Sequence, residues 1–416
     1  VPSGAQAVME WVRLHHESVT GRDGYLEFYK KDFQKFIQYN IRDVELVQKL
    51  EEKLKLIELA VALAYSAGVN YQDVFSQVRT WDVIIYNYLS EKGIVIPPKR
   101  KFRKDEQYAG AYVKEPIVGM HKWVVSFDLN SLYPHLIMQF NISPETLTEQ
   151  GTRGTISPEG ILKNSRNSML FIEEHKKNDL SVAANGTTYR KDIRGFLPEL
   201  MEKIYNERVI FKKKMLAAEQ EYEKTKNKEL VKEISRCNNI QMARKIQLNS
   251  AYGAIGNQYF RYFKLANAEA ITLSGQVSIN WIMNKVNAYL NKILKSGVVD
   301  YVIASDTDSL YVNMGPLVES VYKGREKTTQ SVVSFLDKVC QVEFEKYIES
   351  SYQELAEYVN AYEQKMIMKR ECIAERGIWT AKKRYILSVW DSEGVRYEES
   401  KLKIKGIEAI KSSTPA

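Results

Sequence analysis

Three aspartates stand next to apolar runs that are typical of buried strands. Asp128 follows the run WVVSF, and Asp306 and Asp308 lie between the runs YVIA and LYV. On extended backbone, residues i and i+2 point to the same side of a strand, so Asp306 and Asp308 are expected to lie side by side. Two like charges held together are unfavourable unless a cation neutralises them. The alternative is an Asp-Thr-Asp-Ser turn that satisfies its polar groups with its own backbone.

Carboxylates that converge at strand ends are typical of sites that hold divalent cations. With Asp128 as a third member, the set can hold a pair of metal ions. Such a pair activates an attacking oxygen and stabilises a leaving oxygen in phosphoryl transfer. Mg²⁺ suits this chemistry because it takes few protein carboxylates and completes its shell with substrate phosphates and water. The aspartates therefore predict a metal-dependent site for phosphoryl transfer.

A second group of candidates lies in a strongly helical stretch, which the pattern divides into two helices joined near Asn227. Arg208 and Lys212 are four residues apart and share one face of the first helix. The spacing i, i+4, i+7 and i+8 places on one face of the second helix Lys245, Asn249, Tyr252 and Gly253. Together these residues predict a cationic cradle for a triphosphate. The alternative is a salt-bridged hairpin on the surface.

The elements that must position these residues follow from hydrophobic periodicity. Helices are predicted over 32–67, 265–295 and 330–368, and β structure over 112–128 and the last fifty residues. The pair Pro97-Pro98 breaks the chain and is a candidate boundary, because a basic cluster follows it: Lys99, Arg100, Lys101, Arg103 and Lys104. Residues 151–196 are rich in Gly, Asn, Ser and Thr, which favours loops and short elements. The pattern predicts an α+β protein.

Composition narrows the class of protein. The chain has 416 residues and a net charge of +8, which favours a polyanionic partner. The three cysteines are far apart in the sequence, so we expect neither a disulfide framework nor a zinc site, and a reducing compartment fits. No apolar stretch approaches the ~18 residues that span a membrane. The first residues lack an initiator Met and a signal-peptide pattern, which suggests a fragment or one half of a split protein.

Six motifs give the chain a resemblance to the family B DNA polymerases, and most of all to their bacteriophage members. In order, "DLNSLYP", "KIQLNSAYG" and "SDTDS" resemble polymerase motifs A, B and C. "YAGA" resembles the element between the exonuclease and polymerase domains, and "KKRY" resembles the element that grips the primer duplex. "YNIRD" resembles the last exonuclease motif. The resemblance covers nearly the whole chain.

The resemblance implies a fold and its domains. The fold would be an α+β family B palm, an antiparallel sheet backed by helices, with an inserted helical-hairpin fingers domain and the tail of a ribonuclease H-like exonuclease domain. The implied boundaries are 1–60 for the end of the exonuclease domain, 61–104 for a helical connector, 105–197 and 259–405 for the palm, 198–258 for the fingers, and 406–416 for the start of the thumb.

The resemblance also implies site residues. Asp128, Asp308, Asp306 and the Leu129 carbonyl would hold two Mg²⁺ ions, for which Mn²⁺ can substitute, and Tyr133 would exclude a 2′-hydroxyl from the sugar site. The implied nucleotide-binding residues are Ser131, Leu132, Tyr133, Arg208, Lys212, Lys245 and Asn249, and Lys245 also counts among the catalytic residues. Tyr252 and Gly253 would lie at the nascent base pair. Contacts to DNA would come from Tyr108, Gly110, Lys382, Lys383, Arg384 and Tyr385. Tyr39 and Asp43 would be an exonuclease remnant.

Some residues depart from the family pattern. His135 stands where the family usually has Ser, and Ala251 replaces a larger residue in motif B. The predicted fingers hairpin is also shorter than in the phage members, which leaves its reach open. Glu371 matches an acidic position near the metals, and its role is open.

The implied activity is template-directed DNA synthesis from dNTPs on a primer-template, in the cytoplasm of an infected bacterial host. The exonuclease activity would be incomplete in this chain. A sliding clamp and a single-strand-binding protein would be further partners, through regions outside this chain, and no membrane is implied. Two rival hypotheses are a nucleotidyl transferase that uses ribonucleotides, against which Tyr133 argues, and a non-catalytic DNA-binding relic, against which the three aspartates argue.

Overall fold

The structure is a computed structural model, and it describes residues 21–100, 107–148, 154–324 and 326–410. The chain divides into two compact units, Val1–Ala62 and Leu63–Ala416. The described part of the first unit contains helices α2 (Gly21–Lys31) and α3 (Phe33–Leu54) and the start of α4 (Leu56–Ala67). Three members of the predicted basic cluster lie outside the described residues: Lys101, Arg103 and Lys104. The first twenty residues of the chain and the last six also lie outside them.

A six-stranded antiparallel sheet forms the centre of the second unit, with strand order β4-β5-β1-β6-β7-β8. The strands are β1 (Gly119–Leu129), β4 (Val302–Asp306), β5 (Ser309–Asn313), β6 (Met368–Ala381), β7 (Arg384–Ser392) and β8 (Val395–Lys405). Side chains alternate along the central strand β1, since successive residues of a strand point to opposite faces. Val125, Phe127 and Leu129 belong to the main core, whereas Val124 belongs to a smaller core. Asp128 therefore lies on the same face as Val124.

Helices supply the rest of the main core. Those that contribute buried side chains include α6 (Leu132–Phe140), α11 (Leu265–Leu294), α13 (Thr329–Val339), the π-helical turn η2 (Cys340–Phe344) and α14 (Glu345–Tyr358). The shorter elements are α7 (Pro158–Leu162), α8 (Arg166–Lys177), α12 (Gly315–Val321), the two-stranded sheet of β2 (Leu180–Val182) and β3 (Thr188–Arg190), and η3 (Glu408–Ile410). The main core thus packs the helices against one face of the sheet.

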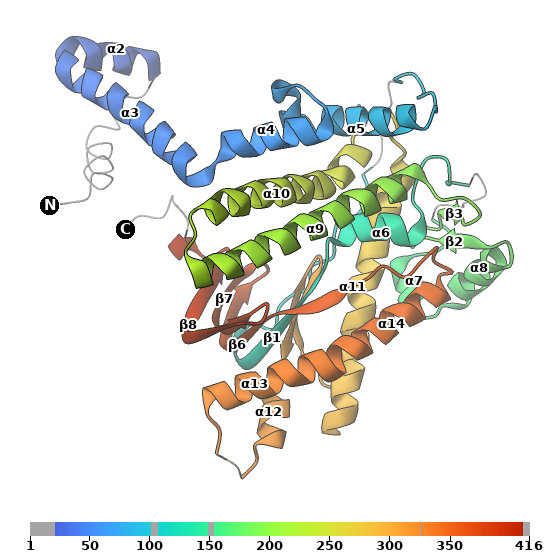
Figure 1. Ribbon diagram of the computed structural model, residues 1–416. Helices are drawn as coiled ribbons and strands as arrows, with labels where there is room; N and C mark the ends of the chain where they lie inside the picture. The colour runs from blue at the N-terminus through green and yellow to red at the C-terminus, as the bar shows by residue number, and fades with distance from the viewer. Residues whose placement is uncertain (1–20, 101–106, 149–153, 325, 411–416) are drawn as a thin grey trace. The chain divides into compact units, whose positions relative to one another are not determined.

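Two long helices, α9 (Phe196–Thr225) and α10 (Glu229–Ile255), run side by side as a hairpin (Figure 1). The first turns of α9 are rooted in the main core through Leu197, Leu200 and Met201. The hairpin turn contains Asn227, whose side-chain oxygen accepts a hydrogen bond from the Glu229 backbone N–H at 3.0 Å. The two predicted helices and their turn residue are confirmed.

Helix α5 (Gln77–Glu91), which follows the 3₁₀ turn η1 (Tyr71–Phe75), packs against α10. The Trp81 indole N–H donates to the Ser250 hydroxyl at 3.0 Å. Asp82, 4% exposed, forms an ion pair with Arg261 at 2.7 Å just beyond the end of α10. These contacts hold the C-terminal end of α10 against α5.

The other predicted elements agree with the structure in most places. The helix predicted over 265–295 and the β-rich C-terminal region are confirmed. The helical region predicted over 32–67 forms two helices, α3 and α4, which are separated by a left-handed residue at Lys55. The β structure predicted over 112–128 begins as a strand only at Gly119. The helix predicted as far as residue 368 is wrong at its end, because α14 stops at Tyr358 and Met368 already begins β6. In the part of the chain that the structure describes, no helix is long and apolar enough to cross a lipid bilayer.

Candidate active site

Asp128 and Asp308 come from neighbouring strands of the sheet. Asp128 lies near the end of β1, directly opposite Ser309 of β5. The backbone N–H of Leu129 donates to the Asp308 carbonyl at 2.9 Å, which ties the end of β1 to the turn before β5. The two carboxylates interact electrostatically across this junction. The sheet therefore brings these two predicted site residues together.

Asp306 and Asp308 lie close together, as expected, since both line one cavity and the charge of Asp306 raises the pKa of Asp308. The expectation that they lie on extended backbone is wrong. Asp306 pairs with Ser309, so that Thr307 and Asp308 form a tight turn, and Thr307 adopts a left-handed conformation with φ 59°. The turn reverses the chain between the two aspartates, and the i, i+2 rule for extended backbone no longer applies. Asp306 instead lies 3.3 Å from the Lys383 ammonium. The turn alternative described the local backbone correctly.

A β-bulge in β6 directs the Glu371 side chain toward the site. Ser126 of β1 pairs with Cys372, but the next residue, Phe127, pairs with Arg370, which leaves Glu371 as the extra residue. A bulge re-aims a side chain that regular alternation would send to the other face. Glu371 accepts a hydrogen bond from the Ser126 hydroxyl at 2.9 Å and pairs with Lys403 of β8 at 2.5 Å. Both of its carboxylate oxygens are thus engaged.

Burial and neighbouring carboxylates raise the pKa values of Asp128 and Asp308. Burial, and then the charges of Asp308 and Glu371, raise the pKa of Asp128 to about 7. Burial also raises the pKa of Asp308 to about 6, with further contributions from Asp306 and Glu371. Lys403 partly offsets this for Asp128. Such shifts are typical of carboxylates that await a cation.

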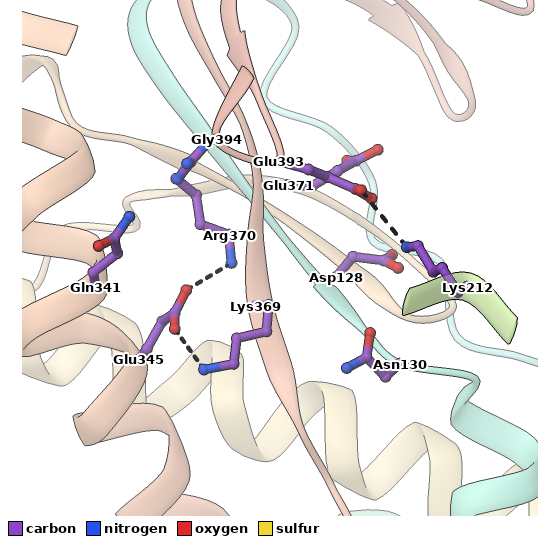
Figure 2. A pocket seen from close by; sticks show the side chains of 10 residues that line it. All are labelled: Asp128, Asn130, Lys212, Gln341, Glu345, Lys369, Arg370, Glu371, Glu393 and Gly394. Carbon is purple, nitrogen blue, oxygen red and sulfur yellow. Dashed lines mark hydrogen bonds and ion pairs between the residues drawn. The ribbon is translucent and has the colours of Figure 1, made fainter. Parts of the chain in front are cut away.

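Two cavities share Asp128 and Glu371. One, of about 550 Å³, is also lined by Asp306, Asp308, Lys383, Tyr385, Lys403 and Lys405. The other, of about 520 Å³, is also lined by Asn130, Lys212, Lys369 and Glu393, and Figure 2 shows the Lys212 ammonium directed toward Glu393 near Asp128. The lining of both cavities mixes carboxylates with cationic side chains, which suits a substrate that carries phosphates and metal ions.

The residues present fit a divalent cation held partly by substrate. Among the described residues, no group of three or more His, Cys, Asp or Glu side chains has a geometry that could hold a metal. Asp128 and Asp308 bring two carboxylates to the junction between β1 and the turn before β5. Mg²⁺ is commonly bound by one or two carboxylates together with substrate phosphates. The like-charge repulsion between the two aspartates is the feature that a cation would relieve.

Some of the predicted nucleotide-binding residues lie at or near the start of α6. Ser131 has a left-handed backbone with φ 46° and precedes the first helical residue, Leu132. The Arg208 guanidinium of α9 donates to the Ser131 hydroxyl at 3.3 Å. One helical turn further along α9, the Lys212 ammonium lies 4.0 Å from Glu393. Arg208 and Lys212 thus face this end of the sheet together, as their spacing predicted.

A tyrosine cluster lies at the base of α10. The rings of Tyr133 and Tyr252 have centroids 4.7 Å apart, and the hydroxyls of Tyr252 and Tyr108 are 3.0 Å apart. Gly253 does not share this environment: a β-carbon there would meet the Gln77 side chain of α5. The missing side chain of Gly253 thus allows α5 to approach α10, while Lys245 and Asn249 are exposed on α10.

The predicted DNA-contact residues have different environments. Lys382 and Lys383, in the turn between β6 and β7, pair with Glu115 and Asp306. Arg384 pairs with Glu408. Tyr385 is 7% exposed and its hydroxyl lies 2.7 Å from that of Tyr311, so its ring belongs to the core. The Gly110 carbonyl accepts a hydrogen bond from Gln276.

Tyr39 and Asp43 lie on α3 of the first unit. A hydrogen bond with Tyr25, burial and the charge of Asp43 together raise the pKa of Tyr39 to about 12. The two predicted residues are therefore neighbours on one face of the helix.

Two residues that line the cavities, Lys403 and Glu393, were not among the predicted site residues. Lys403 is the middle residue of "KLKIK", whose alternating lysines place every second side chain on one face of β8. Although burial favours the neutral amine, Glu371 raises the pKa of Lys403. Glu393 lies in the turn between β7 and β8 with φ 50°. The "DSEG" segment signals a turn, but nothing in the sequence indicates that this turn faces α9.

The sheet, the helical hairpin and the aspartates at the strand ends agree with the sequence motifs. A family model described as DNA polymerase family B matches residues 74–414. The chain belongs to the family B DNA polymerases.

Curated relatives give the same assignment. The chain is 38% identical to the DNA-directed DNA polymerase of Escherichia phage RB69, in an alignment that covers 93% of this chain and 47% of the relative. It is 35% identical to the DNA-directed DNA polymerase of Enterobacteria phage T4, over 96% of this chain and 49% of the relative. A DNA polymerase of Pyrococcus glycovorans is 28% identical over 92% of this chain and 40% of the relative. The chain thus spans about half the length of the phage relatives.

Proposed function

We propose that this chain carries the nucleotidyl-transfer centre of a DNA-directed DNA polymerase. The observation that carries the proposal is the junction of Asp128 and Asp308, where the end of β1 is hydrogen-bonded to the β4–β5 turn and the charge of Asp308 raises the pKa of Asp128. Family membership supports the same reaction. In the domain names used for this family, the six-stranded sheet would be the palm and the α9–α10 hairpin would be the fingers. The first unit would be the tail of an exonuclease domain.

In the proposed reaction, the primer 3′-oxygen attacks the α-phosphorus of a dNTP. A new P–O bond forms, the bond to the β-phosphate bridging oxygen breaks, pyrophosphate leaves, and the hydroxyl proton passes to water. Two Mg²⁺ ions, held by Asp128, Asp308 and the Leu129 carbonyl, would supply charge stabilisation at the attacking and leaving oxygens. Arg208, Lys212 and Lys245 would bind the triphosphate through charge-assisted hydrogen bonds. Pairing with a template base selects the nucleotide, as in any template-directed synthesis.

The Tyr133 ring supports the choice of deoxyribonucleotides. It packs against Tyr252, which limits its freedom to move away from a sugar above it. A rigid ring at this position would exclude a 2′-hydroxyl by steric contact. This interpretation weakens the rival hypothesis of a ribonucleotide transferase.

The partners we propose are primer-template DNA, with Lys382 and Lys383 near its backbone, and dNTPs. A sliding clamp and a single-strand-binding protein would bind through regions outside this chain. The site of action would be the cytoplasm of an infected bacterial host.

Primer extension with dNTPs or with rNTPs, in Mg²⁺ or Mn²⁺, tests the proposal. We expect extension with dNTPs that Asp128→Ala reduces at least a thousandfold, because a lost ligand removes several kcal/mol of transition-state stabilisation. Asp192→Ala is the matched control, since Asp192 is exposed and forms an ion pair with Arg190, two residues earlier in the chain. Tyr133→Ala should increase rNTP use far more than dNTP use. Normal extension by Asp128→Ala would refute the metal assignment, and a wild-type preference for rNTPs would favour the ribonucleotide rival.

A further inference from the structure

His135 is a buried imidazole in α6, at the position where the motif usually has a small residue. Its side chain is 2% exposed. The ring atom Nδ1 lies 3.0 Å from the Ser131 carbonyl oxygen, which also accepts the His135 backbone N–H at 3.2 Å. Because a carbonyl only accepts, Nδ1 must carry the proton in this contact. Burial lowers the pKa of His135, and the charges of Lys365 and Arg208 lower it further, which favours the neutral ring.

The other side of the imidazole contacts α9. The rings of His135 and Tyr205 have centroids 4.5 Å apart and meet edge to face at 86°. Tyr205 lies where α9 leaves the core: Ile204 is 4% exposed, whereas residues 212–214 are exposed. Arg208 follows Tyr205 by three residues and so lies on the same side of the helix. The imidazole thus packs at the base of the exposed part of α9.

His135 contacts Ser131 directly through its hydrogen bond, and the helix of Tyr205 contacts Ser131 through Arg208. The backbone of Ser131 is strained. A left-handed conformation is unfavourable at a residue other than Gly, and Ser131 adopts it with φ 46° and ψ 60°. Its carbonyl is held by His135, and its hydroxyl is held by Arg208 at 3.3 Å. The ring contact between His135 and Tyr205 links these two restraints, because Tyr205 and Arg208 belong to one helix. The start of α6 and the position of α9 are therefore coupled through one imidazole.

We propose that His135 is a positioning residue that sets the Ser131 backbone and the register of α9, and thereby the site of the nucleotide triphosphate. This inference rests on the proposed function for its nucleotide part. His135 does not touch the reacting atoms. It acts through Ser131, which offers a hydroxyl, and through Arg208, which offers a cation.

Two substitutions separate the two contacts of the imidazole. A serine can still donate to the carbonyl four residues earlier in a helix, but it leaves the Tyr205 ring without its partner. A phenylalanine keeps the ring contact and removes the hydrogen bond. His135→Ser and His135→Phe are therefore complementary.

The chain offers a matched control in His175 of α8. This ring is also buried, and its Nδ1 likewise lies 2.8 Å from the carbonyl four residues earlier, that of Phe171. It also packs against an aromatic ring, with centroids 4.1 Å apart. His175→Ser removes an equivalent group from a part of the fold that the proposal does not involve.

The first measurement is hydrogen–deuterium exchange by mass spectrometry on the ligand-free chain, in peptides that cover 129–140. Both His135 variants should exchange faster there than wild type, and His175→Ser should not. The second is steady-state primer extension. Loss of an aromatic contact or of one hydrogen bond predicts a dNTP KM about three- to tenfold higher, with kcat within about twofold. Thermal unfolding of each variant identifies any that does not fold.

Unchanged exchange and unchanged KM in both His135 variants would overturn the proposal, as would an equal effect of His175→Ser. A fall in kcat at constant KM would also overturn it, because it would place His135 in the chemical step. If wild type neither extends primers nor binds dNTPs, the proposed function fails and the nucleotide role fails with it. The exchange data still decide separately whether His135 holds Ser131.

Discussion

Asp128 is held in the folded chain at a free-energy cost. Its carboxylate is partly buried beside Asp308 and Glu371, and its pKa of about 7 lies above the ordinary value of 3.8. A group whose pKa is raised by folding binds its proton more tightly in the folded state. Asp128 therefore contributes fully to the free energy of unfolding below pH 4, and this contribution is lost as the pH rises through 7. The metal-free site is therefore strained at neutral pH.

Asp128→Asn should stabilise the metal-free chain at pH 8. The amide removes the charge and keeps the shape, so we expect a gain of about 1–2 kcal/mol in the free energy of unfolding, allowing for solvent screening. At pH 5, where wild-type Asp128 is protonated, the gain should nearly vanish. Denaturant unfolding in EDTA at both pH values measures the difference.

Mg²⁺ provides the converse check on Asp128. It should stabilise wild type more than Asp128→Asn at pH 8. An Asn variant that is less stable than wild type at pH 8 would contradict the repulsion that the two carboxylates imply.

The turn between β6 and β7 depends on a close approach by the end of β8. Gly406 follows β8 with φ +63°, and a β-carbon there would collide with the Lys383 carbonyl oxygen. The obstacle is backbone, which cannot rotate away as a flexible side chain can. Gly406 therefore fixes the turn that carries Lys382 and Lys383.

Gly406→Ala should lower the free energy of unfolding by about 2–4 kcal/mol, from the left-handed backbone and the collision together. Gly297→Ala is the matched control, because Gly297 has φ +74° but open space around it. It should show only about 1 kcal/mol. Urea unfolding measures both. Equal losses would mean that the turn adjusts freely, and a weaker affinity for duplex DNA in Gly406→Ala alone would link the turn to DNA binding.

The sequence predicted long helices well, because an apolar stripe repeats many times within each of them. It predicted less well the features that depend on distant pairing. The left-handed Thr307 and the bulge at Glu371 arise only when β4, β5, β1 and β6 lie next to one another. Motif resemblance located Asp128 and Asp308, but the ion pair of Glu371 with Lys403 joins two strands that are not adjacent in the sheet. Local sequence carries no signal for such a contact.

On the scale of the whole chain, the first unit bears on proofreading. Tyr39 and Asp43 match an exonuclease motif, yet hydrolysis with two metals needs several converging carboxylates. The described residues 21–62 contain no such group. We expect no 3′→5′ degradation of single-stranded DNA by the purified chain in Mg²⁺ or Mn²⁺. Degradation that depends on metal and disappears in Asp43→Ala would show that further carboxylates complete the site.

The central position of β1 has a consequence for biosynthesis. This strand is made first, yet both of its neighbours, β5 and β6, come after the helical hairpin and the long helix α11. At ~5–20 residues per second, the ribosome needs on the order of 10–35 seconds between the end of β1 and the start of β5, the first of the two neighbours to be made. During that interval the apolar strand has no permanent pairing partner on either edge. The nascent chain thus presents an aggregation-prone segment while α9 and α10 can already form from local contacts, and its yield should depend on chaperones that shield β1.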